Sequence, residues 1–105
     1  MNGLQKRGLI VRRFAKIDDN QRVIVEALRK AGASVQSLAT VGKGCPDIVV
    51  GFRGKNMLME IKKDGVSPSR QRLTADEQAW HEAWKGNVVI VKTADEALKA
   101  MEFMA

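Results

Sequence analysis

The sequence predicts one α/β domain in which a small mixed β-sheet is flanked by helices. Three segments carry apolar residues at helical spacing, and four shorter segments have the composition of β-strands. Glycines, prolines and helix-capping residues separate these segments and give the order α-β-β-β-α-β-α. The chain has 105 residues, the size of a single domain, and its 45% apolar and 29% charged residues are typical of a globular protein.

The first helix is expected to run from Asp19 to Ala31. Asp18 and Gln21 have the spacing of a capping box at its start, and Gly32 is placed to end it. Its apolar positions are Val23, Ala27, Leu28 and Ala31. Residues 33–41 then alternate well enough to predict a half-buried strand.

A β-hairpin is expected next, with strands at Asp47–Arg53 and Asn56–Lys63. A tight turn at Gly54-Lys55 would join them, and Pro46 would fix the entry to the first strand. One side of this hairpin is wholly apolar, which makes it the core side: Ile48, Val50, Phe52, Met57, Met59 and Ile61.

An exposed basic loop is expected at residues 64–73, before the second helix. Thr74 and Glu77 have the spacing of a capping box that opens this helix, and Gly86 is placed to end it. Its apolar side is expected to pack in the core or against a second subunit, although tryptophans can also stack on bases: Ala79, Trp80, Ala83 and Trp84.

The C-terminal part contains one more strand and one more helix. Val88–Val91 is wholly apolar, which predicts a strand buried on both faces. Thr93 and Glu96 form a further capping box and open the last helix. That helix carries Ala97, Leu98, Met101 and Met104 on its apolar face.

The hairpin turn sets which side chains share a face. If Gly54 and Lys55 are the turn residues, Asp47 lies opposite Lys62 and Val49 lies opposite Glu60. Because side chains alternate along a strand, Asp47, Glu60 and Lys62 would then project together on the polar side.

Two carboxylates and a lysine on one polar face predict a site for metal-assisted phosphodiester cleavage. Two nearby carboxylates repel each other, and a divalent cation between them relieves that repulsion. Oxygen ligands favour Mg²⁺ or Mn²⁺, which can lower the pKa of a bound water and stabilise a leaving oxygen. The competing interpretation is a surface Asp-Lys cross-strand pair with Glu60 as a neighbour.

The ordered motifs resemble the PD-(D/E)xK nuclease superfamily. More closely, the run from about Asp18 to Leu98, about four fifths of the chain, resembles the small stand-alone phage and prophage members of the VRR-NUC family. It rests on residues 18–35, Gly44-Cys-Pro-Asp-Ile-Val-Val-Gly51, Glu60-Ile-Lys62 and residues 69–80.

This resemblance implies a restriction-endonuclease-like core and a Mg²⁺- or Mn²⁺-dependent DNA endonuclease. Asp47, Glu60 and the backbone carbonyl of Ile61 would bind the metal, and Lys62 would be the catalytic lysine. Stand-alone members resemble Holliday junction resolvases, so the expected substrate is branched DNA. The expected assembly is a homodimer that makes two symmetric nicks.

One position departs from the family pattern. Many related resolvases carry a metal-binding glutamate in the first helix, and Gln21 stands at that position here. Gln21 can bind the metal weakly, through its own oxygen or through a water, or it can serve only as the capping partner of Asp18.

Four further residues are candidates for DNA binding. Lys43, Arg70 and Arg72 stand in the loops that flank the predicted site, where they can contact phosphates or simply be solvated. Related nucleases place a helix glutamine near the active site, and Gln78 stands at that position, with a solvated glutamine as the alternative.

The charge distribution supports a polyanionic partner. The formal net charge is +6. Residues 1–17 are expected to form a basic N-terminal arm, and residues 18–105 a single domain. The arm carries five basic residues and no acid before Ile17. Residues 73–105 carry three lysines against six acids. The single cysteine, the absence of a long apolar run and the phage likeness predict a cytoplasmic protein of a bacterial or phage-infected cell, with no membrane partner.

Two alternatives to a junction resolvase share the same fold. One is a basic DNA-binding module without catalysis, which the glutamine at position 21 favours. The other is a general nicking or duplex endonuclease with little preference for branched DNA.

Overall fold

The structure, a computed structural model, describes residues 19–63 and 65–104. The described helices are α3 (Asp19–Lys30), α4 (Pro68–Gln71), α5 (Ala75–Ala83) and α6 (Ala94–Met104). The strands are β1 (Ser34–Ser37), β2 (Ile48–Phe52), β3 (Lys55–Ile61) and β4 (Val88–Val91). The predicted order of elements is therefore confirmed except for α4, which is an additional helix, and the expected basic arm at residues 1–17 lies outside the described residues.

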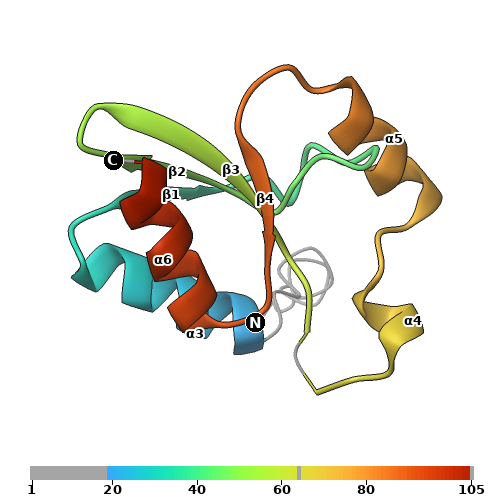
Figure 1. The fold of residues 1–105 in the computed structure, drawn as a ribbon, viewed down its shortest axis with the longest axis horizontal. Coiled ribbons are helices and arrows are strands. Elements are labelled where there is room, and N and C mark those ends of the chain that lie inside the picture. Colours follow the sequence, from blue (N-terminus) through green and yellow to red (C-terminus); the bar gives the residue numbers. More distant parts are fainter. Residues whose placement is uncertain (1–18, 64, 105) are drawn as a thin grey trace, which may run out of the picture.

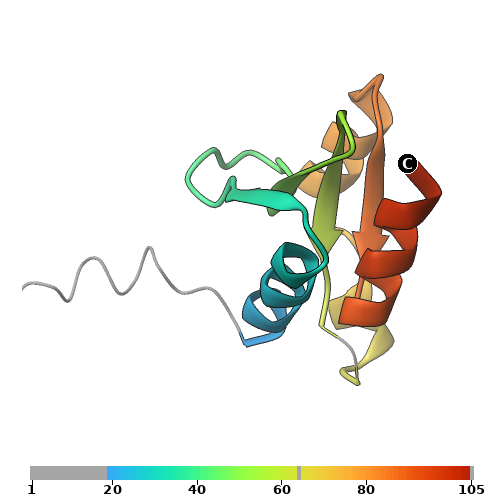
Figure 2. The same cartoon turned by 90° about the vertical axis from the view of Figure 1, so that its left-hand side faces the viewer.

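The described strands form one mixed sheet in the order β1-β2-β3-β4. The first three strands are antiparallel to one another, and β4 runs parallel to β3. Helices α3 and α6 pack side by side on one face of this sheet, whereas α5 lies on the opposite side (Figures 1 and 2). This arrangement confirms the predicted mixed sheet flanked by helices.

The core lies between the sheet and the α3–α6 pair. The apolar side of the hairpin faces these helices, as predicted, and only Phe52 among its six residues is more than marginally exposed. Helix α3 contributes Ile24 and Leu28, and α6 contributes Ala97 and Met101. Burial of these side chains, worth about 1.5–3 kcal/mol for each large one, holds the sheet on its helices.

Several predicted boundaries are wrong. Strand β1 is only four residues long, because the chain turns at Leu38–Val41, where the Val41 N–H donates to the Leu38 carbonyl. Residues 64–73 are not a simple loop, because α4 forms within them, with Ser67 as its N-cap and a proline in its first turn.

The environments of α5 and β4 also differ from the prediction. Helix α5 has the predicted capping box, but it contributes no buried residue, and Trp84 at its end is 48% exposed. Strand β4 is an edge strand among the described residues, so Ile90 is 45% exposed and only Val91 is buried. No helix among the described residues is long and apolar enough to cross a membrane.

Candidate active site

The predicted acidic pair and lysine lie together at one end of the β2–β3 hairpin. Asp47 immediately precedes β2, Glu60 is the penultimate residue of β3, and Lys62 directly follows that strand. Glu60 Oε2 lies 3.7 Å from Lys62 Nζ. The carboxyl groups of Asp47 and Glu60 are close enough that each shifts the pKa of the other.

The hairpin turn lies one residue earlier in the chain than predicted, so the register of the two strands differs from the prediction. Phe52 pairs with Lys55, so the turn residues are Arg53 and Gly54, which both adopt positive φ, at 52° and 81°. The paired residues end at Ile48 opposite Met59, and the Asp47 N–H donates to the Met59 carbonyl at 3.1 Å, so Asp47 lies beside Met59 and Glu60 of β3 rather than opposite Lys62. The shift moves every partner by two residues, which preserves the face on which each side chain projects.

Asp47 is held by a backbone amide of the neighbouring strand. Its Oδ2 accepts a hydrogen bond of 2.6 Å from the Ile61 N–H. Burial raises the pKa of Asp47 above its ordinary value, although the Ile61 hydrogen bond opposes this shift. Because the N–H and C=O of one strand residue point to the same side, the Ile61 carbonyl is also directed toward the Asp47 side of β3.

Glu60 is the most deeply buried acid of the site. It is 3% exposed, and its Oε1 is buried without a hydrogen-bond partner. Burial, and then repulsion from Asp47 and Glu77, raises the pKa of Glu60 to about 9. A carboxylate at this position is therefore costly unless a cation neutralises it.

Lys62 makes a short ion pair with an acid from α5. Its Nζ donates a 2.7 Å hydrogen bond to Glu77 Oε1, and its side chain is 13% exposed. Burial alone would lower the pKa of Lys62, but Glu77, Glu60 and Asp47 together raise it above its ordinary value. The lysine is therefore held as a cation beside the two acids.

Glu77 is the site residue that sequence reasoning missed. Its Oε1 also accepts the Thr74 N–H at 2.9 Å, so one oxygen both caps α5 and binds Lys62. Burial by itself would raise the pKa of Glu77, but the hydrogen bonds from Lys62 and Thr74 lower it below its ordinary value. The capping spacing predicted only its role in the helix, because α4 and its flanking turns separate it from Lys62 along the chain.

A glycine allows α5 to approach the site. Gly44 has φ +84°, and a Cβ there would collide with the backbone carbonyl of Asp76 in the first turn of α5. The loop before Asp47 therefore packs backbone to backbone against the start of α5. This contact and the Lys62–Glu77 ion pair fix the helix beside the carboxylates.

Helix α3 is joined to the same end of the sheet. The Asn20 side-chain amide donates to the backbone carbonyls of Lys62 and Lys92, both at 3.0 Å. These residues directly follow β3 and β4, so one amide connects the first turn of α3 to the ends of two parallel strands. It places the first turn of α3, which contains Gln21, near the predicted site.

The donor set fits a hard divalent cation. A divalent cation would satisfy the unpartnered Glu60 Oε1 and would offset the repulsion by which Asp47 opposes ionisation of Glu60. Among the described residues, no group of three or more His, Cys, Asp or Glu side chains is arranged to hold a metal. Two carboxylates with water completing the shell are typical of Mg²⁺ rather than of a structural zinc site.

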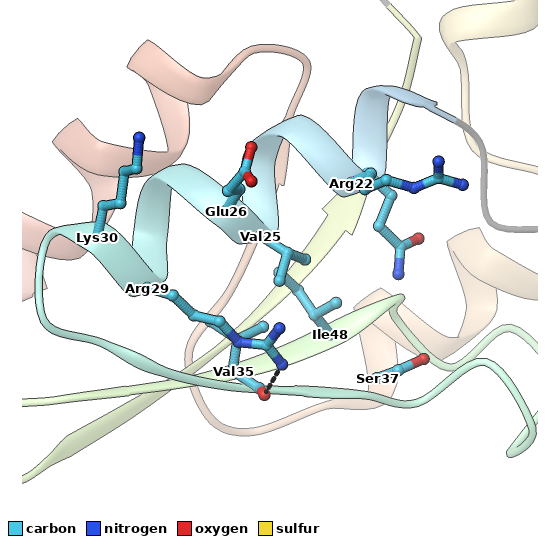
Figure 3. A pocket seen from close by; sticks show the side chains of 9 residues that line it. Arg22, Val25, Glu26, Arg29, Lys30, Val35, Ser37 and Ile48 are labelled. Carbon is cyan, nitrogen blue, oxygen red and sulfur yellow. Dashed lines mark hydrogen bonds between the residues drawn. The ribbon is translucent and has the colours of Figure 1, made fainter.

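Gln21 lies in a groove between α3 and β1. It is 8% exposed, and it lines a groove of about 590 Å³ together with Val25, Val35 and Ile48 (Figure 3). Arg29 crosses the groove and donates a 3.0 Å hydrogen bond to the Val35 carbonyl. The metal-binding role of Gln21 stays a prediction, and its predicted capping partner Asp18 lies outside the described residues.

The predicted DNA-binding residues fall into two groups. Lys43 is exposed at φ +56° in the loop before Asp47, Arg70 lies in α4, and Arg72 is exposed directly after it. Gln78 is exposed and donates to Glu82 one turn later at 2.7 Å, so Glu77 rather than Gln78 is the α5 residue that reaches the site.

The mixed sheet with helices on both sides is a fold found in a known class of domains. A solved structure described as a VRR_NUC domain matches this chain with a TM-score of 0.60. The match covers 81% of this chain and 92% of the other, at 24% sequence identity. The chain therefore has the fold of a VRR_NUC domain; no family model and no curated protein matches its sequence.

Proposed function

We propose that the protein is a metal-dependent endonuclease that cleaves branched DNA, as a Holliday junction resolvase does, and that it acts as a homodimer. The observation that carries this proposal is the buried Asp47–Glu60 pair, with one unsatisfied carboxylate oxygen, beside the Lys62 ammonium. The likeness of the fold to a VRR_NUC domain supports a nuclease.

The residues would divide the chemistry among them. Asp47, Glu60 and the Ile61 carbonyl would hold Mg²⁺ or Mn²⁺, which when bound supplies an acidic water and neutralises charge on the phosphate. Lys62 would contact the phosphate and stabilise negative charge as it develops there. Ile61 N–H keeps the Asp47 carboxylate oriented, and Glu77 keeps the Lys62 ammonium in place.

Charge and stoichiometry favour a DNA junction as substrate. The formal net charge of +6 promotes binding to a polyanion, and Lys43, Arg70 and Arg72 stand on segments that flank the acids. A homodimer would present two such sites related by a twofold axis, which matches the symmetry of a four-way junction.

The test is cleavage of an end-labelled four-way junction in Mg²⁺. Wild type is expected to make paired symmetric nicks, whereas Asp47→Ala and Glu60→Ala are expected to lose at least a hundredfold in rate, because the metal would lose a ligand. Asp95→Asn, at an exposed acid of α6, is the matched control and should cleave as wild type. Added EDTA should abolish cleavage by every variant.

Each other outcome supports a different function. Equal cleavage of junction and linear duplex would indicate a general nicking endonuclease of the same fold. Salt-sensitive DNA binding without cleavage in Mg²⁺ or Mn²⁺ would indicate a non-catalytic binding module. Unchanged activity in both alanine variants would refute the assignment of the acidic pair.

A further inference from the structure

The face of the sheet that carries the acids continues into an uncharged groove. Val49 pairs with Leu58, and Leu58 lies two residues before Glu60 on β3, so Leu58 and Glu60 project on the same face. A groove of about 390 Å³ opens there. Its lining includes Val49, Asn56, Leu58, Trp84, Gly86 and Asn87.

Trp84 presents a fixed aromatic surface at this groove. Its ring stacks on Trp80 with centroids 4.6 Å apart and planes 17° apart, yet the residue is 48% exposed. Gly86 lies against its edge, since a Cβ there would be 3.0 Å from the indole Nε1. An exposed tryptophan that is held in one orientation is suited to stack on a flat ligand.

We propose that this groove binds an unpaired nucleobase of the substrate, stacked on Trp84, from a nucleotide adjacent to the phosphate at the acidic pair. The choice of DNA as the ligand rests on the proposed function. The groove itself is separate from the acidic pair, and the proposed cleavage chemistry does not use it.

The spacing along the strands fits this assignment. Alternate residues on one strand are about 7 Å apart, so Leu58 lies roughly that far along β3 from Glu60. This distance is on the scale of one nucleotide of an extended single strand. A strand whose phosphate is at the acids would therefore bring a neighbouring base to the groove.

The chemistry of the lining favours a base over a phosphate or a protein helix. The lining residues carry no charge, so the groove offers a phosphate no counter-ion. Its apolar floor suits a π-face, and the amides of Asn56 and Asn87 can hydrogen-bond the edge of a base. Duplex DNA keeps its bases stacked, so the groove would favour DNA with unpaired nucleotides, such as a single-stranded tail or a branch point at which a base pair has opened.

The test is binding in EDTA, where no cleavage occurs, with a hairpin oligonucleotide that carries a single-stranded tail containing 2-aminopurine. Wild type is expected to quench the probe and to bind the tailed hairpin about tenfold more tightly than Trp84→Ala does. Trp84→Phe keeps a ring and should retain most of the quenching. Phe103→Ala, at an aromatic residue of α6 that is 93% exposed, is the matched control and should bind as wild type.

The contrary outcomes are distinct. Equal binding by wild type and Trp84→Ala, or an equal loss on a blunt hairpin without a tail, would overturn the proposal. A second copy of the chain would occupy the groove instead if wild type sedimented as a dimer and left the probe unquenched while Trp84→Ala sedimented as a monomer. That result would also overturn the proposal. Quenching through Trp84 without cleavage in Mg²⁺ would retain the groove and reject the nuclease, whereas cleavage with no effect of Trp84→Ala would do the reverse.

Discussion

Glu60 combines deep burial with an acid's tendency to ionise, and this conflict has a measurable cost. Its pKa of about 9 lies above its ordinary value of 4.5, so the folded protein keeps a proton that the unfolded chain releases between these values. The free energy of unfolding therefore falls as pH rises through this window, by at most about 1.4 kcal/mol per pH unit. A bound divalent cation would remove the cost, because it stabilises the ionised form.

We accordingly expect Glu60→Gln to be more stable than wild type at pH 8 in EDTA. The amide is neutral at every pH, so the difference in the free energy of unfolding between variant and wild type should grow from pH 5 to pH 8. Urea denaturation at both pH values measures it, and the subtraction removes the contribution of every other group. A difference that stays constant would show that Glu60 ionises freely in the folded state.

Glu77 performs two tasks through one oxygen, and two substitutions separate them. Glu77→Gln keeps an oxygen for the Thr74 N–H but loses the charge that raises the pKa of Lys62, so that pKa should fall. Glu77→Ala loses both interactions and should lower the free energy of unfolding by about 1–2 kcal/mol more than Glu77→Gln does.

NMR titration of the Lys62 side chain and urea denaturation measure the two effects. Glu82→Gln, at an exposed acid of the same helix that binds Gln78, is the control and should change neither. An unchanged Lys62 pKa in Glu77→Gln would show that the 2.7 Å ion pair between Lys62 and Glu77 does not form when the protein is in solution.

At the scale of elements, the approach of α5 to the loop before Asp47 depends on Gly44. Gly44→Ala adds a methyl group against the Asp76 carbonyl and places it at φ +84°, so it should destabilise the fold by about 2–3 kcal/mol. Gly42→Ala is the matched control, because Gly42 has a similar φ of +75° but nothing within 4 Å of the added Cβ, and should cost about 1 kcal/mol.

Urea denaturation gives both values, and their difference isolates the contact with α5 from backbone strain. Gly44→Ala should also weaken the Lys62–Glu77 pair, since it forces α5 away from the loop. Equal destabilisation by the two variants would mean that α5 does not approach this loop as closely as the structure shows.

The hairpin shows what the sequence could and could not predict about the candidate site. The alternating pattern predicted which side chains share a face, and this result survived an incorrect turn because partners moved by two residues. The turn itself was misplaced because a glycine is favoured at the second position of a type I′ turn. Arg53 takes the first position, and its guanidinium packs over the Phe52 ring at 4.8 Å.

The sequence pattern could not predict contacts between elements that are distant along the chain. The Lys62–Glu77 pair and the Gly44–Asp76 approach depend on where α5 lies, which no periodicity specifies. The four apolar residues of β4 have the pattern of a strand buried on both faces, yet edge position leaves Ile90 exposed. Only α4 had an unused signal, because Ser67 followed by a proline is typical of a helix start.

At the scale of the whole molecule, charge rather than shape should govern the first step of the proposed DNA binding. The net charge of +6 is spread unevenly, and the two exposed cations Lys43 and Arg72 lie on the segments that flank the acidic pair. Each cation that contacts a phosphate releases condensed counter-ions on binding, so the affinity falls with added salt.

Lys43→Ala and Arg72→Ala are therefore each expected to reduce the slope of log affinity against log salt by about 0.9, because one phosphate contact is lost. Fluorescence anisotropy with a labelled junction in EDTA, at several salt concentrations, measures this slope without interference from cleavage. Lys99→Ala removes another exposed cation, one that already pairs with Asp95 on α6, and it should leave the slope unchanged. If all three variants reduced the slope equally, DNA binding would reflect net charge alone; a selective effect of the first two would place the DNA on the side of the sheet that carries Asp47, Glu60 and Lys62.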